Sequence, residues 1–165
     1  MRGWPGSGKS TKATSILGQR LKSGGTLADI VSADFYFTDP ITGQYEYDPR
    51  DVEHAHSYCK MCFREAVKLG SDLIIVDNTN IKRQHYEYYV DYAKRAGYEV
   101  YQAVPETPWK DDVEACQAKT KDSGHNVPLD IVRKMKREFE QDTGLGFFEC
   151  PGDTSKPTED NQEGK

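Results

Sequence analysis

Residues 3–11 read Gly3-Trp4-Pro5-Gly6-Ser7-Gly8-Lys9-Ser10-Thr11, and this stretch decides how the rest of the chain is interpreted. It fits the pattern G-x-x-x-x-G-K-[ST], in which glycines let successive backbone N–H groups turn inward around a phosphate. A helix that begins behind the loop adds the positive end of its dipole. We therefore expect a phosphate-binding loop, with Lys9 on the β- and γ-phosphates and the Ser10 hydroxyl on Mg²⁺. The expected nucleotide-binding residues are Gly3, Pro5, Gly6, Ser7, Gly8, Lys9, Ser10 and Thr11.

Outward from this loop, helical and strand patterns alternate. Helices are expected from the loop to Gly24, from Val52 to Gly70, around Tyr86 to Gly97, over 108–119 and over 128–139; strands are expected over 28–33, 73–76 and 98–104. Residues 35–49 predict a loop or small hairpin, and 119–127 a polar loop. The alternation favours a parallel, three-layer α/β fold of the P-loop NTPase, nucleoside-kinase-like type.

The strand that normally precedes such a loop is missing from the sequence, because only Met1-Arg2 stand before Gly3. Two explanations are open: the chain begins inside the natural domain, or the fold tolerates a gap. We favour the first explanation. A sheet interior left uncovered would expose strand edges and apolar surface. The expectation is thus a sheet that lacks most or all of its first strand.

Composition and charge set limits on size and partners. The 165 residues make one domain, which we place at 1–148. The remainder, 149–165, carries three of the five net negative charges, lacks an apolar period and predicts a disordered acidic tail. With 22 Lys+Arg against 27 Asp+Glu, the chain is not expected to coat duplex nucleic acid, because such binding requires many neutralised phosphates.

Several features point to the cytoplasm. The apolar run 73–76 is far shorter than the roughly 20 residues that a membrane span needs. No basic region followed by an apolar one comes after Met1, so we predict no signal peptide. Four cysteines in a chain of this length do not make a disulfide framework. We therefore expect a cytoplasmic protein that makes no contact with membranes.

Two aspartates follow expected strands, at the edge where α/β sheets bind ligands. Asp34 could accept the proton of a hydroxyl that attacks the γ-phosphorus. Asp77 follows the run 73–76, a pattern whose carboxylate commonly acts on Mg²⁺. A plainer interpretation stays open for each: Asp34 would begin a surface turn, and Asn78, Thr79 and Asn80 would form an Asx-type turn.

Together these motifs resemble the polynucleotide 5′-hydroxyl kinases of the phage type, within the P-loop ATPases and kinases. They look closest to the short kinase-like domains of animal ubiquitin-ligase-binding proteins. The resemblance runs from Gly3 to about Phe139. Beyond the loop, it rests on Ser32-Ala33-Asp34-Phe35, Tyr45-Glu46-Tyr47-Asp48-Pro49, Ala55-His56, Ile75-Val76-Asp77-Asn78-Thr79-Asn80, Pro105-Glu106-Thr107-Pro108-Trp109 and Asn126-Val127-Pro128. It implies ATP and Mg²⁺ as cofactors, Asp34 as general base and single-stranded nucleic-acid ends as acceptors.

The chain departs from that family at two places. Phe37 stands where phage-type enzymes have an arginine that engages the acceptor phosphate, and the lid stretch 116–125 contains no arginine. Lys119 or Lys121 is expected to close on the γ-phosphoryl group, although lysine lacks the bidentate fork of arginine. Three functions stay open: transfer to a nucleic-acid end, transfer to a small molecule such as a nucleoside, and nucleotide binding without turnover.

Other residues have two interpretations each. Cys59 and Cys62, with His54 and His56 nearby, could suggest zinc, but both cysteines lie on an apolar helical stripe and core packing is the simpler account. The basic run 133–137 is a solvated helix face or a track for an oligonucleotide backbone. His125 is an ordinary loop residue or a group of the lid. The aromatic residues that either form a loop core or stack a terminal base are Phe35, Tyr36, Phe37, Tyr45 and Tyr47.

Overall fold

The computed structural model describes residues 1–148, so the expected tail 149–165 lies outside the described residues. Its centre is a small parallel sheet of two strands, β1 (Ala28–Val31) and β2 (Leu73–Val76). Ala28 pairs with Leu73 and Val31 with Val76. Two parallel strands require a long crossover, and a helix supplies it here. The predicted parallel α/β architecture is therefore confirmed, with a smaller sheet than expected.

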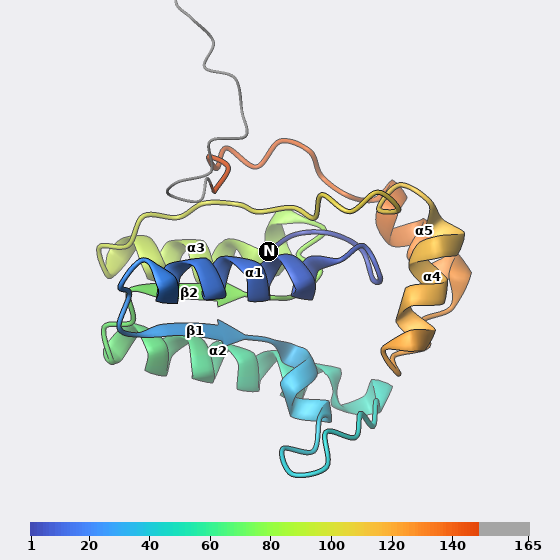
Figure 1. Cartoon of the computed structure of the whole chain (residues 1–165), viewed down its shortest axis with the longest axis horizontal. Coiled ribbons are helices and arrows are strands. Elements are labelled where there is room, and N and C mark those ends of the chain that lie inside the picture. Colours follow the sequence, from blue (N-terminus) through green and yellow to red (C-terminus); the bar gives the residue numbers. More distant parts are fainter. Residues whose placement is uncertain (149–165) are drawn as a thin grey trace, which may run out of the picture.

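Helices on both faces complete the fold (Figure 1). They are α1 (Lys9–Lys22), α2 (Val52–Lys68), α3 (Arg83–Arg95), α4 (Val113–Asp122) and α5 (Leu129–Arg137), with the 3-10 helices η1 (Ala33–Phe37) and η2 (Pro49–Asp51). Within residues 1–148, no helix combines the length and the apolar character needed to cross a membrane.

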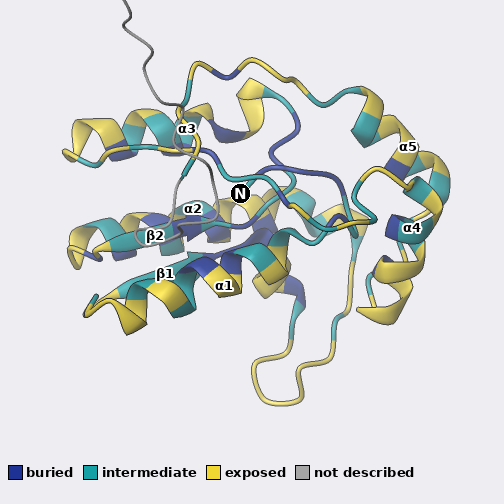
Figure 2. Ribbon diagram, turned by 45° about the horizontal axis from the view of Figure 1, so that its top comes forward, coloured by how far each residue is buried: buried dark blue, intermediate teal, exposed yellow. Residues whose placement is uncertain are grey.

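Alternation along the strands produces the three layers. Ile75 packs with Ala13 and Ile16 of α1 on one face of the sheet. The side chain of Val31 packs on the opposite face with Phe63 of α2 and residues of α3. Because successive strand side chains point to opposite faces, each strand contributes to both clusters. Figure 2 shows buried residues on the helix faces turned toward the sheet, while the strands themselves are mostly of intermediate burial.

Two boundaries differ from the predictions. Residues 98–104 form no regular strand; only Gln102 makes a bridge, to Phe147. The helix expected over 108–119 begins at Val113 and runs to Asp122, because the Asp112 carboxylate caps its first turn by accepting from the Ala115 N–H (2.9 Å). The hairpin alternative for 35–49 holds in part, since η1 is followed by an antiparallel bridge between Thr38 and Tyr45.

An apolar cavity of about 600 Å³ separates β2 from residues 100–103. Residues Met1 and Arg2 occupy one end of this cavity. The Met1 amino group donates to Val76 O (2.9 Å), and the Arg2 N–H donates to Ala103 O (2.8 Å). A strand in this line would have backbone partners on both sides. The expected upstream strand stays a prediction.

The side chain of Arg2 fixes the start of the phosphate-binding loop against the rest of the domain. This side chain is only 3% exposed. The guanidinium donates to the carbonyls of Asn80 (3.0 Å), Ile81 (3.1 Å) and Glu140 (2.7 Å) and lies over the ring of Phe139 at 4.4 Å. Several hydrogen bonds satisfy this buried charge, so residues 1–3 are held firmly against α3 and the C-terminal segment.

Candidate functional site

The glycines of residues 3–11 adopt the conformations that the pattern predicts. Gly6 (φ 74°) and Gly8 (φ 96°) lie in the left-handed region, which side chains disfavour. A Cβ on Gly6 would lie 1.9 Å from the carbonyl oxygen of Cys116 in α4, and one on Gly8 would lie 2.4 Å from Cγ2 of Thr107. The loop apex is therefore in direct contact with the lid helix. Gly8 also leaves the first N–H groups of α1 without a side-chain cap.

Three hydrogen bonds fix the loop from behind. The Ser7 hydroxyl donates to Trp4 O (2.7 Å), the Thr107 hydroxyl donates to Ser7 O (2.8 Å), and the Trp109 indole N–H donates to Gly6 O (3.1 Å). Ser7 is completely buried. Its side chain thus holds the loop together and does not face the space in front of it.

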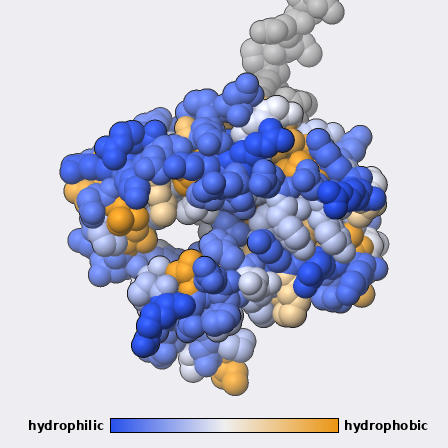
Figure 3. Space-filling model, turned by 180° about the vertical axis from the view of Figure 1, so that it is seen from behind, coloured by the Kyte–Doolittle hydropathy of each residue, from blue (hydrophilic) through white to orange (hydrophobic). Residues whose placement is uncertain are grey.

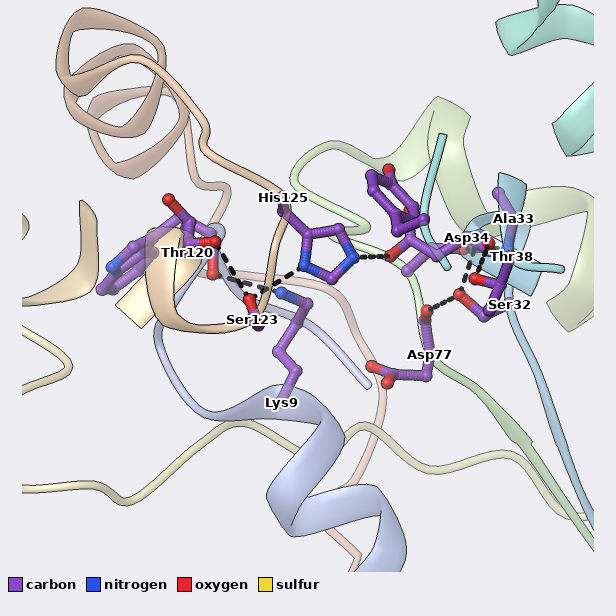
Figure 4. A network of polar contacts seen from close by, with 12 residues as sticks. Lys9, Ser32, Ala33, Asp34, Thr38, Asp77, Thr120, Ser123 and His125 are labelled. Atoms are coloured by element: carbon purple, nitrogen blue, oxygen red, sulfur yellow. Dashed lines mark hydrogen bonds and ion pairs between the residues drawn. The ribbon is translucent and has the colours of Figure 1, made fainter. Parts of the chain in front are cut away.

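Lys9 and the two acids come together, as the sequence predicts. The Lys9 ammonium donates to Trp4 O (3.1 Å). Burial lowers the pKa of Lys9, while the charges of Asp77 and Asp34 oppose that effect and raise it. Both carboxylates therefore act electrostatically on the lysine of the phosphate loop. Figure 4 shows Lys9, Asp34, Asp77 and His125 around the same space.

This space is a cavity of about 880 Å³, in the upper range for small-molecule sites. Figure 3 shows an opening between the α4–α5 side and the rest of the molecule. Among the predicted site residues, those lining the cavity are Pro5, Gly6, Gly8, Lys9, Ser10, Thr11, Asp34, Asp77 and Lys119. Gly3, Ser7 and Lys121 do not line it.

Asp34 lies just beyond β1, inside η1, where neighbouring groups fix its backbone. Its N–H donates to the Ser32 hydroxyl (3.2 Å), which itself donates to Asp77 O (2.8 Å). The Asn78 side-chain oxygen accepts from the Ala33 N–H (2.9 Å). Asn78 thus positions the turn that carries Asp34. The sequence did not predict this role for Asn78, because Asn78 follows β2 whereas Asp34 follows β1, and the contact between them depends on how the two strands pair.

Asp77 offers an oxygen suited to a cation. The residue is 7% exposed, and within residues 1–148 its Oδ1 has no hydrogen-bond partner. Asp77 and Ser10 line the same cavity. An orphaned buried carboxylate oxygen in that cavity fits Mg²⁺, which prefers oxygen ligands. The described residues hold no group of three or more His, Cys, Asp or Glu placed to bind a metal ion. A magnesium ion bound through one or two protein oxygens and substrate phosphates would need no such group.

The two lid lysines have different positions. Lys119 lines the cavity, with its ammonium 3.4 Å from Asp122 Oδ2 and 5.7 Å from the centre of the Trp109 ring. Lys121 is exposed on α4 away from the cavity. Of the two lysines expected in the lid, only Lys119 therefore borders the cavity that contains the phosphate loop.

Two other residues singled out in the sequence, Phe37 and Cys59, are buried and pack in the hydrophobic core. Phe37, at the position of the family's arginine, is 8% exposed and packs against the ring of Tyr47 at 5.1 Å. Cys59 is completely buried in the same core, as the packing interpretation predicted. Burial raises the pKa of its thiol, which keeps it protonated and unreactive. The aromatic residues Phe37, Tyr45 and Tyr47 also line the cavity next to Asp34.

A glycine loop at a helix N-terminus, a half-buried lysine and two acids at the carboxyl edge of a parallel sheet define a P-loop nucleotide-binding domain. The comparisons with known proteins agree with this class. Residues 1–141 match the AAA domain family, and the chain belongs to that family. Its fold and relatives make it a P-loop domain of the kinase-like kind.

The chain resembles segments of longer proteins. Over 110 residues, 67% of this chain, it is 34% identical to human NEDD4-binding protein 2. It is 30% identical over 145 residues, 86% of this chain, to 2′,3′-cyclic-nucleotide 3′-phosphodiesterase of Rattus norvegicus. Over an alignment of 123 residues that covers 62% of this chain, it is 32% identical to human YLP motif-containing protein 1. The matching parts span 6%, 31% and 6% of these proteins, respectively.

Proposed function

We propose that this domain transfers the γ-phosphoryl group of ATP to a hydroxyl group, with the 5′-hydroxyl of a polynucleotide end as the preferred acceptor. The observation that carries the proposal is the position of Asp34. Its carboxylate lines the same cavity as the phosphate loop and acts electrostatically on Lys9. A carboxylate beside the γ-phosphate position can accept the proton of an attacking hydroxyl.

The reaction assigns one task to each group. Backbone N–H groups of residues 6–11 and Lys9 bind the β- and γ-phosphates, and Lys119 approaches the γ-phosphate from the lid. Asp34 takes the acceptor proton as the new P–O bond forms and the bond to ADP breaks. Ser10 and Asp77 would hold Mg²⁺, which neutralises phosphate charge when bound.

Two features support a nucleic-acid end as acceptor. Phe37, Tyr45 and Tyr47 offer ring surfaces beside Asp34, and bases stack on aromatic rings with little dependence on sequence. The name of the rat relative describes an enzyme that acts on cyclic nucleotides, which also places nucleotide phosphate chemistry among the relatives. A terminal acceptor needs only a local positive pocket, so the net charge of −5 does not oppose this proposal.

We also propose a cytoplasmic location. The thiols of Cys59, Cys62 and Cys116 are free, which suits a reducing compartment. Fractionation of cells that express the chain tests the location.

The function is tested with labelled ATP. The protein is incubated with 5′-hydroxyl RNA and DNA oligonucleotides and, separately, with a panel of nucleosides and sugars. The proposal is supported if the wild-type protein labels the oligonucleotides and the Asp34→Asn and Lys9→Ala variants do not. Labelling of small molecules alone favours a metabolite kinase, and tight ATP binding with no labelled acceptor favours a binding module.

A further inference from the structure

His125 connects the lid to the presumed base. Its Nε2 lies 3.9 Å from Asp34 Oδ2, and its Nδ1 lies 2.9 Å from the Ser123 hydroxyl. The ring also packs edge-on against Tyr45, with centroids 4.2 Å apart. Figure 4 shows the imidazole between Ser123 and Asp34. Two of these three contacts join His125 to a segment that is distant in the sequence, the one that carries Asp34 and Tyr45.

The turn that carries His125 is built to place it. Thr120, only 2% exposed, accepts the N–H groups of His125 (2.9 Å) and Asn126 (3.0 Å) at its carbonyl and that of Val127 (3.1 Å) at its hydroxyl. Gly124 (φ 80°) and Asn126 (φ 45°) supply the left-handed backbone that this turn requires. The position of the imidazole thus follows from a fixed backbone.

Tyr45 holds the other side of the same carboxylate. Its hydroxyl donates to Asp34 Oδ1 (3.3 Å). Burial, and then the charge of Asp34, raises the pKa of Tyr45, so the phenol remains a proton donor. The two oxygens of Asp34 therefore face two different groups, Tyr45 from the hairpin and His125 from the lid.

We propose that His125 is a positioning residue, which fixes the rotation of the Asp34 carboxylate and fastens the lid over it. The inference rests on the proposed function, in which Asp34 is the base. The Asp34 side chain is 57% exposed, so without a partner it would sample several rotamers. Holding a base in one orientation lowers the barrier of the chemical step and leaves ATP binding unchanged.

The test compares three substitutions at this position. His125→Gln places a side-chain amide near the former Nε2, His125→Asn places one near the former Nδ1, and His125→Ala removes both. We expect His125→Ala and His125→Asn to lower kcat by about 10–100-fold with KM for ATP within about twofold, and His125→Gln to recover most of kcat. Equal kcat values in all four proteins would overturn the inference, as would a change confined to KM.

A second measurement does not depend on turnover. Amide hydrogen exchange of residues 120–127 should rise in His125→Ala and in Asp34→Ala, and the double variant should exchange no faster than the faster single variant. Additive effects, or unchanged exchange, would contradict a tie between the two side chains. If Asp34→Asn retains activity, the proposed function fails; if Asp34→Asn is inactive while His125→Ala equals wild type, only the present inference fails.

Discussion

The Met1 amino group should make the stability of this chain depend on pH between about 6 and 8. The amine lies at the end of the apolar cavity and donates a hydrogen bond to Val76 O at 2.9 Å. Burial lowers the pKa of this group from 8.0 to about 6, although the charge of Asp77 partly opposes the change. Acetylation of the amine replaces the ionisable group with a neutral amide, and the cavity has room for the added atoms.

The sign and size follow from proton linkage. Between the two pKa values the unfolded chain binds more protons than the folded chain, so the free energy of unfolding rises with pH. The difference between 8.0 and about 6 corresponds to about 2.7 kcal/mol, at about 1.4 kcal/mol per pH unit. The folded state carries this full penalty below pH 6 and loses it above pH 8.

Urea unfolding from pH 5 to pH 9 measures the effect in free and acetylated chains. Burial also lowers the pKa of His56 and His85, so both chains share a histidine contribution. The stability gained by acetylation should therefore grow by about 2–3 kcal/mol as pH falls from 9 to 5. A gain that is the same at every pH would show that the amine is solvated in the folded state, and the reasoning would fail.

Three further predictions concern the loop, the metal and the cavity. Gly6→Ala places a Cβ against the Cys116 carbonyl and should weaken ATP binding at least tenfold in calorimetry. The control Gly18→Ala has open space around the new Cβ. It should bind ATP normally, and its free energy of unfolding should rise by up to about 1 kcal/mol. Asp77→Asn should raise the Mg²⁺ concentration for half-maximal activity about tenfold or more; an unchanged magnesium titration would remove Asp77 from the metal site. An apolar, β-branched segment of four residues fused before Met1 should raise Tm above that of a Gly-Ser segment of equal length, since each buried CH₂ contributes about 0.8 kcal/mol; equal Tm values would mean that the cavity does not accept a strand.

Much of the site followed from the sequence because its parts are local. The loop pattern required left-handed glycines, and Gly6 and Gly8 have them. Asp34 and Asp77 each follow a strand of the sheet, and parallel strands bring their carboxyl ends to one edge. Their meeting near Lys9 was therefore predictable without knowledge of any side-chain contact.

The strand expected over 98–104 shows where periodicity is insufficient. Its apolar pattern suits a strand, but a strand needs neighbours on both sides in a buried sheet. Within the described residues, an apolar cavity occupies the place between this segment and β2. The sequence also gave no sign that Arg2 would be buried, because its partners are backbone carbonyls of Asn80, Ile81 and Glu140.

The sequence by itself thus determined the fold class, the phosphate loop and the pair of acids, because short-range backbone rules place them. Only the tertiary structure decided which lid groups reach the site. Lys119 lines the cavity, Lys121 does not, and His125 lies beside Asp34. The positions of Lys119, Lys121 and His125 depend on where α4 ends and on the turn that the hydrogen bonds of Thr120 form after it. Contacts between residues so far apart in the chain follow from packing, which no local pattern encodes.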